Sequence, residues 1–385
     1  MNINLFKDQI PFMKPWLGEE EWLSMKDVIT NGWVSQGPKV EEFENIMAKY
    51  IGVKHAVATN SCTSAMHIAM KIAGIKHGDE VIVADSTCMA NANAIIMAGA
   101  TPVFVDVDKR TYNLNPDLIE SKITSKTKAV MNIDQIGLAN DLDSIQTICS
   151  KNGLYLLDDA ATAVGGKYKG KILGSHGITT TFSFHPRKII TTGEGGMLVT
   201  NDDNIAEQAR ILRSAGASVS DLERHKAKGI ILQKYYDNGF NYRMTDMQAA
   251  MGIVQMTKIN EILKQRKEQA DFYNSKFLSI EELQIPFVPS YSTNAWSSYC
   301  LKTTSKSKIS VPEIIQLLSS KNISVRYGIQ PLHQEPYFKN MNYKDEDYPV
   351  SCDIAENSFF IPIFPGLTSE QQNYVTDTII QVIRG

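Results

Sequence analysis

The sequence predicts an α/β fold with a mainly parallel sheet, followed by a smaller α/β lobe. Over the first 250 residues, short apolar runs alternate with helix-like stretches of roughly 10 to 15 residues. The runs are rich in β-branched residues and apolar on both faces, as expected for strands that helices cover on both sides. Hydrophobic residues make up 43% of the 385-residue chain and charged residues 21%, which excludes a disordered chain, a coiled coil and a collagen-like repeat.

Six of the apolar runs are predicted as buried strands, and a seventh strand ends at Phe184. The six runs lie at 56–58, 81–84, 103–105, 129–131, 154–157 and 197–199. Helix boundaries are also readable between them. Asn115-Pro116 is typical of an N-cap followed by proline at the first helical position. Asp141 is predicted to cap a helix over 142–151 that stops at Asn152-Gly153.

The sequence changes in character near residue 250. A long helix is predicted over 247–277, because apolar residues recur at helical spacing beside a polar outer face. A proline- and serine-rich stretch at 286–298 follows, and a closing helix is predicted over 369–384. We therefore expect a large domain over 1–250 and a smaller C-terminal α/β domain over 251–385.

Charge and cysteine content exclude several classes of partner. Lys and Arg number 39 against 42 Asp and Glu, so the basic excess of a typical nucleic-acid-binding protein is missing. The five cysteines are scattered without a Cys-x-x-Cys pair, which argues against a zinc ribbon or a disulfide framework, and no metal site is expected. No signal peptide or 18-residue apolar run is present, so we expect a cytoplasmic protein with no membrane partner.

Lys188 lies between the strand that ends at Phe184 and a glycine-rich return at 193–196. An ammonium group between two buried strands is costly unless it is paired or used. Burial favours the neutral amine, which is a nucleophile for carbonyl groups. A solvated loop lysine is the alternative interpretation.

Two carboxylates, Asp158 and Asp159, directly follow the apolar run at 154–157. They come at the carboxyl end of a strand, where open α/β sheets place their ligands. One of them could keep a pyridine nitrogen protonated. A helix cap or a metal ligand would account for the pair equally well.

A third feature is the stretch 60–67, which leaves a strand and opens a helix with Ser61, Thr63 and Ser64. Small hydroxyl residues at a helix N-terminus offer a seat for phosphate, although plain N-capping by Ser61 or Thr63 is an equal alternative. Taken together, a phosphate seat, an acidic residue at a strand end and a loop lysine meet the needs of pyridoxal phosphate (PLP).

With these features the chain resembles the PLP-dependent nucleotide-sugar aminotransferases of the DegT/StrS type, within the aspartate-aminotransferase (fold type I) superfamily. The resemblance implies a large domain built on a mainly parallel seven-stranded sheet, plus a smaller C-terminal domain. Similar stretches run nearly end to end and lie at 32–38, 43–44, 78–82, 98–106, 159–161, 183–188, 192–196, 239–245, 331–333 and 362–366.

The resemblance implies a role for each matching residue. Lys188 would form the Schiff base with PLP and later move the proton, and Asp159 would pair with the ring nitrogen. Thr63, the backbone of Ser64, and Ser183 would hold the phosphate. A further residue, Asn241, would reach the phosphate from the partner subunit, which implies a homodimer with shared active sites.

Two positions depart from the family pattern. Cys88 stands where an aromatic residue usually stacks on the cofactor ring, and Thr162 stands where Gln or His usually lies near the phenolic oxygen. Trp33 is as compatible with a core position as with the substrate. The other candidates for substrate contact are Arg326, Tyr327 and His333.

The predicted function is transfer of an amino group from L-glutamate (or glutamine) to a keto-sugar attached to a nucleotide, with pyridoxamine phosphate as the intermediate cofactor form. A sugar dehydratase that depends on PLP or pyridoxamine phosphate is one alternative, although such relatives typically carry His in place of the lysine or an iron–sulfur ligand set. A non-catalytic regulator of the same fold is another, and it would be expected to lose Lys188 or Asp159.

Overall fold

A seven-stranded sheet forms the centre of the computed structural model, which describes residues 6–219 and 232–384. Its strand order is β1-β9-β8-β5-β4-β2-β3. β9 runs antiparallel to both of its neighbours, β1 and β8, and the other neighbouring pairs are parallel, so the sheet is mainly parallel, as predicted. The strands are β1 (His55–Thr59), β2 (Glu80–Ala84), β3 (Thr101–Val105), β4 (Thr127–Ile133), β5 (Tyr155–Asp159), β8 (Thr179–Ser183) and β9 (Gly196–Thr200). All seven coincide with predicted strands.

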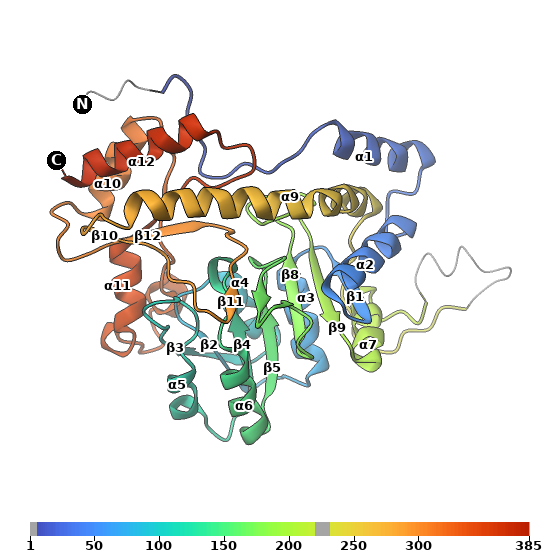
Figure 1. Cartoon of the computed structure of the whole chain (residues 1–385). Helices are drawn as coiled ribbons and strands as arrows, with labels where there is room; N and C mark the ends of the chain where they lie inside the picture. The colour runs from blue at the N-terminus through green and yellow to red at the C-terminus, as the bar shows by residue number, and fades with distance from the viewer. Residues whose placement is uncertain (1–5, 220–231, 385) are drawn as a thin grey trace.

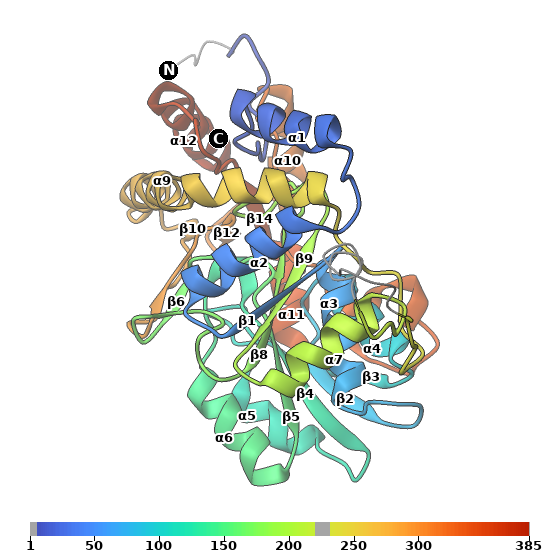
Figure 2. The ribbon, with the colours of Figure 1, turned by 90° about the vertical axis from the view of Figure 1, so that its right-hand side faces the viewer.

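The two faces of the sheet are buried under different helices. Val57 and its cross-strand partner Leu198 belong to one core, and Ala58 and its partner Met197 belong to the other. This alternation follows from the period of two in a strand. Residues of α3 (Cys62–Ile72) and α7 (Asp203–Arg213) fill the first core, and residues of α2 (Pro38–Ile51) and α9 (Asp246–Phe277) fill the second. Figure 2 shows α2 and α7 on either side of β1.

The predicted helix caps are present. Asn115 accepts a hydrogen bond from the backbone N–H of Asp117 (3.1 Å) and begins α5 (Pro116–Ile119), which is only four residues long. Asp141 accepts from the N–H of Ser144 (3.3 Å) at the start of α6 (Leu142–Asn152). That helix ends at Gly153, whose φ of 62° lies in the left-handed region that favours glycine. Residues of another helix, α4 (Met89–Met97), also belong to the first core.

The C-terminal lobe contains an antiparallel sheet of order β10-β12-β14-β13. Its strands are β10 (Leu283–Gln284), β12 (Tyr299–Thr303), β14 (Ser358–Ile361) and β13 (Arg326–Tyr327). Its helices are α10 (Val311–Ser320), α11 (Pro349–Asn357) and α12 (Ser369–Arg384), the last of which matches the predicted closing helix.

Several segments join the two lobes. The long helix α9 begins at Asp246, so the boundary expected at residue 250 falls inside it, and it contacts α1 (Glu19–Asn31), α2 and α12 (Figure 1). The N-terminal segment pairs with the C-terminal lobe, since the N–H of Ile10 donates to the carbonyl of Asn322 (2.8 Å). A second connection comes from β11 (Ser292–Thr293), which follows α9 in the chain. It forms a small sheet with β6 (Lys167–Tyr168) and β7 (Lys171–Ile172) of the large lobe.

Candidate active site

Asp159 and Lys188 come together at the carboxyl ends of β5 and β8. Asp159 is the last residue of β5, is 4% exposed, and lies in register with Thr181 of β8. Lys188 lies half-buried in the loop after β8, where its backbone N–H donates to the carbonyl of His185 (2.8 Å). Burial raises the pKa of Asp159, while the Asn91 amide and the charge of Lys188 lower it. Lys188 therefore lies close enough to stabilise the ionised carboxylate.

The carboxylate of Asp159 is held by three donors. The Asn91 side-chain amide donates to Oδ2 (2.6 Å), the N–H of Ala161 donates to Oδ1 (2.9 Å), and the thiol of Cys62 donates to Oδ1 (3.6 Å). Asn91 is itself oriented by Thr87, whose hydroxyl donates to the amide oxygen (3.1 Å). No sequence pattern indicates Asn91 or Cys62 as neighbours of Asp159, because they lie 68 and 97 positions away along the chain.

The adjacent carboxylate, Asp158, has a different environment. Its oxygens accept from the side chains of Asn132 (2.7 Å) and Thr180 (3.3 Å). Successive side chains of a strand point to opposite faces, which separates Asp158 from Asp159. Burial raises the pKa of Asp158 to about 7. Asp158 thus belongs to a buried polar network with side chains of β4 and β8, and Asp159 is the one of the two carboxylates that lies beside Lys188.

The start of α3 forms a close contact with the end of the sheet. Ser61 is the N-cap, since its hydroxyl accepts from the N–H of Ser64 (3.1 Å), and Thr63 lies half-buried in the first turn. Ser183 of β8 is in register with Gly196 of β9. A Cβ on Gly196 would lie 2.3 Å from the carbonyl carbon of Ser61, so only glycine allows the helix to begin this close to the strands.

This arrangement fits PLP. The N-terminus of α3 presents backbone N–H groups and the positive end of a helix dipole, which suit a phosphate group. Ser183 can add a hydroxyl at the same place. Asp159 suits a protonated ring nitrogen, and Lys188 suits an aldehyde.

The two residues that depart from the family pattern lie in contrasting settings. Cys88 is the N-cap residue of α4 and is exposed. Thr162 already has two backbone partners, because its hydroxyl donates to the carbonyl of Asp134 (2.7 Å) and accepts from the N–H of Gly137 (3.0 Å). The hydroxyl of Thr162 therefore stabilises the loop after β4 through these two hydrogen bonds. A contact of Thr162 with the cofactor stays a prediction.

Asn241 lies beside the start of α3 in its own protomer. Its carbonyl accepts from the side chain of Asn60 (3.4 Å), and the N–H of Asn60 donates to the carbonyl of Tyr242 (2.9 Å). The side chain of Asn241 is exposed. Its contribution to a partner's site stays a prediction.

The candidates for substrate contact are dispersed. Trp33 is half-buried, and its indole N–H donates to the carbonyl of Gln36 (3.1 Å). Arg326 and Tyr327 are exposed on β13. His333 is only 5% exposed and both of its ring nitrogens face carboxylates, so a direct contact with substrate would require it to give up a partner.

The fold and the residues around Lys188 define a fold type I PLP-dependent transferase. The model of the DegT/DnrJ/EryC1/StrS aminotransferase family matches residues 15–380, and the chain belongs to this family. None of the helices in the described part of the chain has the length and apolar run needed to cross a bilayer.

Similar proteins support the same assignment over nearly the whole chain. The chain is 36% identical over 379 residues to the spore coat polysaccharide biosynthesis protein SpsC of Bacillus subtilis, covering 98% of this chain and 97% of that protein. The putative sugar aminotransferase Spr1654 of Streptococcus pneumoniae, in its PMP form, has a TM-score of 0.92 at 27% identity and covers 97% of this chain and 99% of its own. DesV of S. venezuelae, solved with a ketimine intermediate, has a TM-score of 0.90 at 27% identity, covering 98% and 100%. The protein is a PLP-dependent sugar aminotransferase.

Proposed function

We propose that this enzyme takes an amino group from L-glutamate, with glutamine as the alternative donor, and transfers it to a keto-sugar attached to a nucleotide. The observation that carries the proposal is the meeting of Lys188 with the buried, hydrogen-bonded carboxylate of Asp159. A dehydratase or a non-catalytic regulator would not be expected to keep both. The five cysteines are all free, which supports the reducing, cytoplasmic location predicted from the sequence.

Each residue of the site has a separate task. The N-terminus of α3 and Ser183 would bind the phosphate and so position the cofactor beside Lys188. Asp159 would accept a hydrogen bond from the ring nitrogen and so keep that nitrogen protonated. PLP supplies an aldehyde that takes up the amino group and a ring that withdraws electrons from the reacting carbon. The amine of Lys188 would remove a proton from the substrate carbon that bears the nitrogen and return it to the cofactor carbon on the other side of that nitrogen.

The first experiment is an absorption spectrum of the PLP-loaded enzyme before and after L-glutamate. We expect the visible band to give way to the shorter-wavelength band of pyridoxamine phosphate, and a nucleotide-linked keto-sugar to restore the first band. The same sugar without its nucleotide is the control for the nucleotide. Lys188→Ala should show neither change. An unchanged wild-type spectrum with both glutamate and glutamine would exclude these donors, and turnover by Lys188→Ala would exclude the mechanism.

We also propose that the enzyme is a homodimer in which Asn241 completes the partner's phosphate site. Exposed apolar side chains on and before α1, among them Trp16, Trp22 and Ile29, supply a surface that a second copy would cover. Mixed dimers of Lys188→Ala and Asn241→Ala chains test the shared site. One site of such a dimer would carry both wild-type residues, so activity should reappear on mixing. No recovery in dimers shown to be mixed would place Asn241 in its own protomer's site.

A further inference from the structure

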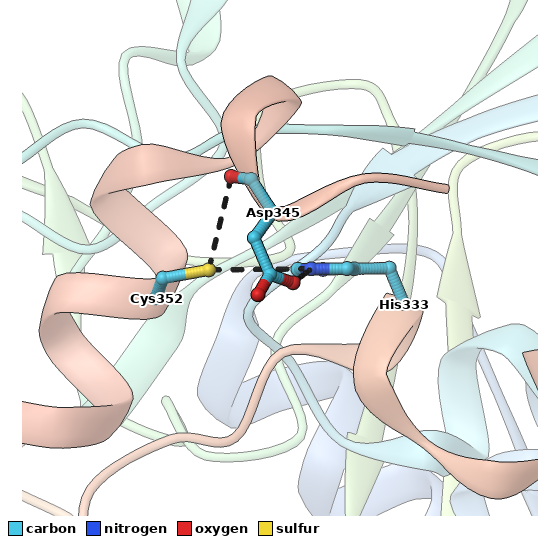
Figure 3. Close-up of side chains that lie close together, drawn as sticks. All are labelled: His333, Asp345 and Cys352. Carbon is cyan, nitrogen blue, oxygen red and sulfur yellow. Dashed lines mark hydrogen bonds and ion pairs between the residues drawn. The ribbon is translucent and has the colours of Figure 1, made fainter. Parts of the chain in front are cut away.

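Three potential metal ligands meet between the C-terminal lobe and the large sheet. His333 comes from the short helix Leu332–Gln334, Asp345 from the short helix Asp345–Asp347, and Cys352 from α11 (Figure 3). One nitrogen, one carboxylate oxygen and one sulfur of these residues lie within 4.8 Å of one another. His333 Nε2 is 2.9 Å from Asp345 Oδ1 and 4.0 Å from Cys352 Sγ.

A buried carboxylate orients the imidazole of His333 through the ring nitrogen that faces away from Asp345 and Cys352. Its Nδ1 is 2.7 Å from Oδ2 of Asp85, which is 0% exposed and also accepts from the backbone N–H of His333 (2.9 Å). The ring also stacks on Tyr348, with a centroid separation of 4.5 Å. With the proton of Nδ1 donated to Asp85, the lone pair of Nε2 can be directed at Asp345 and Cys352. Histidines that bind metals are almost always supported by such a hydrogen bond.

We infer that His333, Asp345 and Cys352 form a zinc site. Imidazole, thiolate and carboxylate are the ligands that Zn²⁺ prefers. With Zn–N and Zn–O near 2.1 Å and Zn–S near 2.3 Å, tetrahedral coordination requires N···O of about 3.4 Å and N···S of about 3.6 Å. The structure has 2.9 and 4.0 Å, so shifts of about 0.5 and 0.4 Å bring these two pairs to tetrahedral distances, and the carboxylate oxygen and the sulfur lie within 4.8 Å of each other.

The surroundings favour a cation at this position. The Gln334 amide nitrogen donates to Asp345 Oδ1 (3.1 Å) and contacts Cys352 Sγ (3.5 Å), so it already bridges two of the three ligands. The side chain of Asp345 is 70% exposed, which gives an ion a path from solvent. Zinc binds the thiolate form of cysteine rather than the thiol. Binding therefore releases the thiol proton to water as the Zn–S bond forms.

A zinc ion here would cross-link three segments of the C-terminal lobe, and the hydrogen bond from His333 to Asp85 would connect the site to the large sheet. The three ligands come from separate segments, and Asp85 directly follows β2, three residues before Cys88. The inference does not depend on the amino donor or on the sugar, so its failure would leave the proposed function intact.

The test is zinc binding to the PLP-loaded enzyme, dialysed free of unbound cofactor because free PLP also binds metals. Titration calorimetry and metal analysis should give one Zn²⁺ per protomer, together with a higher Tm. Cobalt(II) should add a near-ultraviolet thiolate charge-transfer band. Cys352→Ser and Asp345→Asn should each weaken zinc binding at least tenfold. Cys352→Ser should also remove the cobalt band, whereas Asp345→Asn should shift it.

Two control variants remove a thiol and an imidazole that lie outside the proposed zinc site. Cys88→Ser removes an exposed thiol outside the cluster, and His55→Gln removes an imidazole that pairs with Asp203 (2.6 Å) where no thiol completes the set. Both should keep the zinc stoichiometry. Absence of binding to the wild type overturns the inference, as does binding that survives in both Cys352→Ser and Asp345→Asn. Since Asp345 is mostly exposed, Asp345→Asn remains informative if Cys352→Ser fails to fold.

Discussion

Replacing Asn91 with Ala removes the shortest hydrogen bond to Asp159 and leaves every proposed cofactor-binding residue unmutated. Asn91 is 1% exposed and its amide lies 2.6 Å from the carboxylate. A hydrogen bond to a charged group contributes about 1.5–3 kcal/mol. Since about 1.4 kcal/mol is a factor of ten, full loss would lower kcat/KM roughly 10- to 100-fold. Ala161 and Cys62 still donate to Asp159, so we expect a result near the lower end.

The decisive readout is the pH profile. The Asn91 amide lowers the pKa of Asp159, so its loss raises that pKa further. Activity needs the ionised carboxylate, and the acid limb of kcat/KM against pH should therefore move to higher pH. Asn93→Ala, at an exposed position on the same helix, is the matched control. A variant that loses only Tm, with kcat/KM within about twofold and an unmoved acid limb, would refute a positioning role for Asn91.

Three further outcomes follow from the site and its supporting network. Gly196→Ala should weaken PLP binding at least tenfold in a fluorescence titration, because its Cβ would push the start of α3 away, whereas Gly18→Ala, with nothing within 4 Å, should bind normally. Cys88→Phe should tighten PLP binding about fivefold, since an aromatic contact is worth about 1 kcal/mol, and weaker binding would contradict a place over the ring. Burial raises the pKa of Asp158 to about 7, so the folded protein holds this proton more tightly than the unfolded chain, and the stability contribution is lost as pH rises through about 7. Asp158→Asn should therefore gain Tm relative to the wild type as the pH rises from about 4 to about 7, and parallel Tm profiles would contradict this.

Local sequence determined most of the fold. The seven strands of the large sheet, the caps at Asn115 and Asp141, and the long helix ending at Phe277 all lie where propensity and periodicity placed them. These signals are local, because strand and helix periods and capping side chains act within a few residues. The predicted boundary at residue 250 depended on a change in composition, and the continuous helix α9 passes through it.

The sequence also predicted the chemistry of the site, through Lys188, Asp159 and the hydroxyl residues that open α3. The residue pattern alone did not separate Asp158 from Asp159, and the choice of Asp159 came from the family resemblance. The tertiary structure shows why Asp159 is the carboxylate beside the lysine, since the direction of each side chain depends on the phase of the pleat relative to the covering helices. It also decided the partners of Asp159 and the meeting of His333 with Asp85, 248 positions apart. No local pattern encodes such contacts, because they arise where separate strands end at one edge of the sheet and a second lobe closes against them.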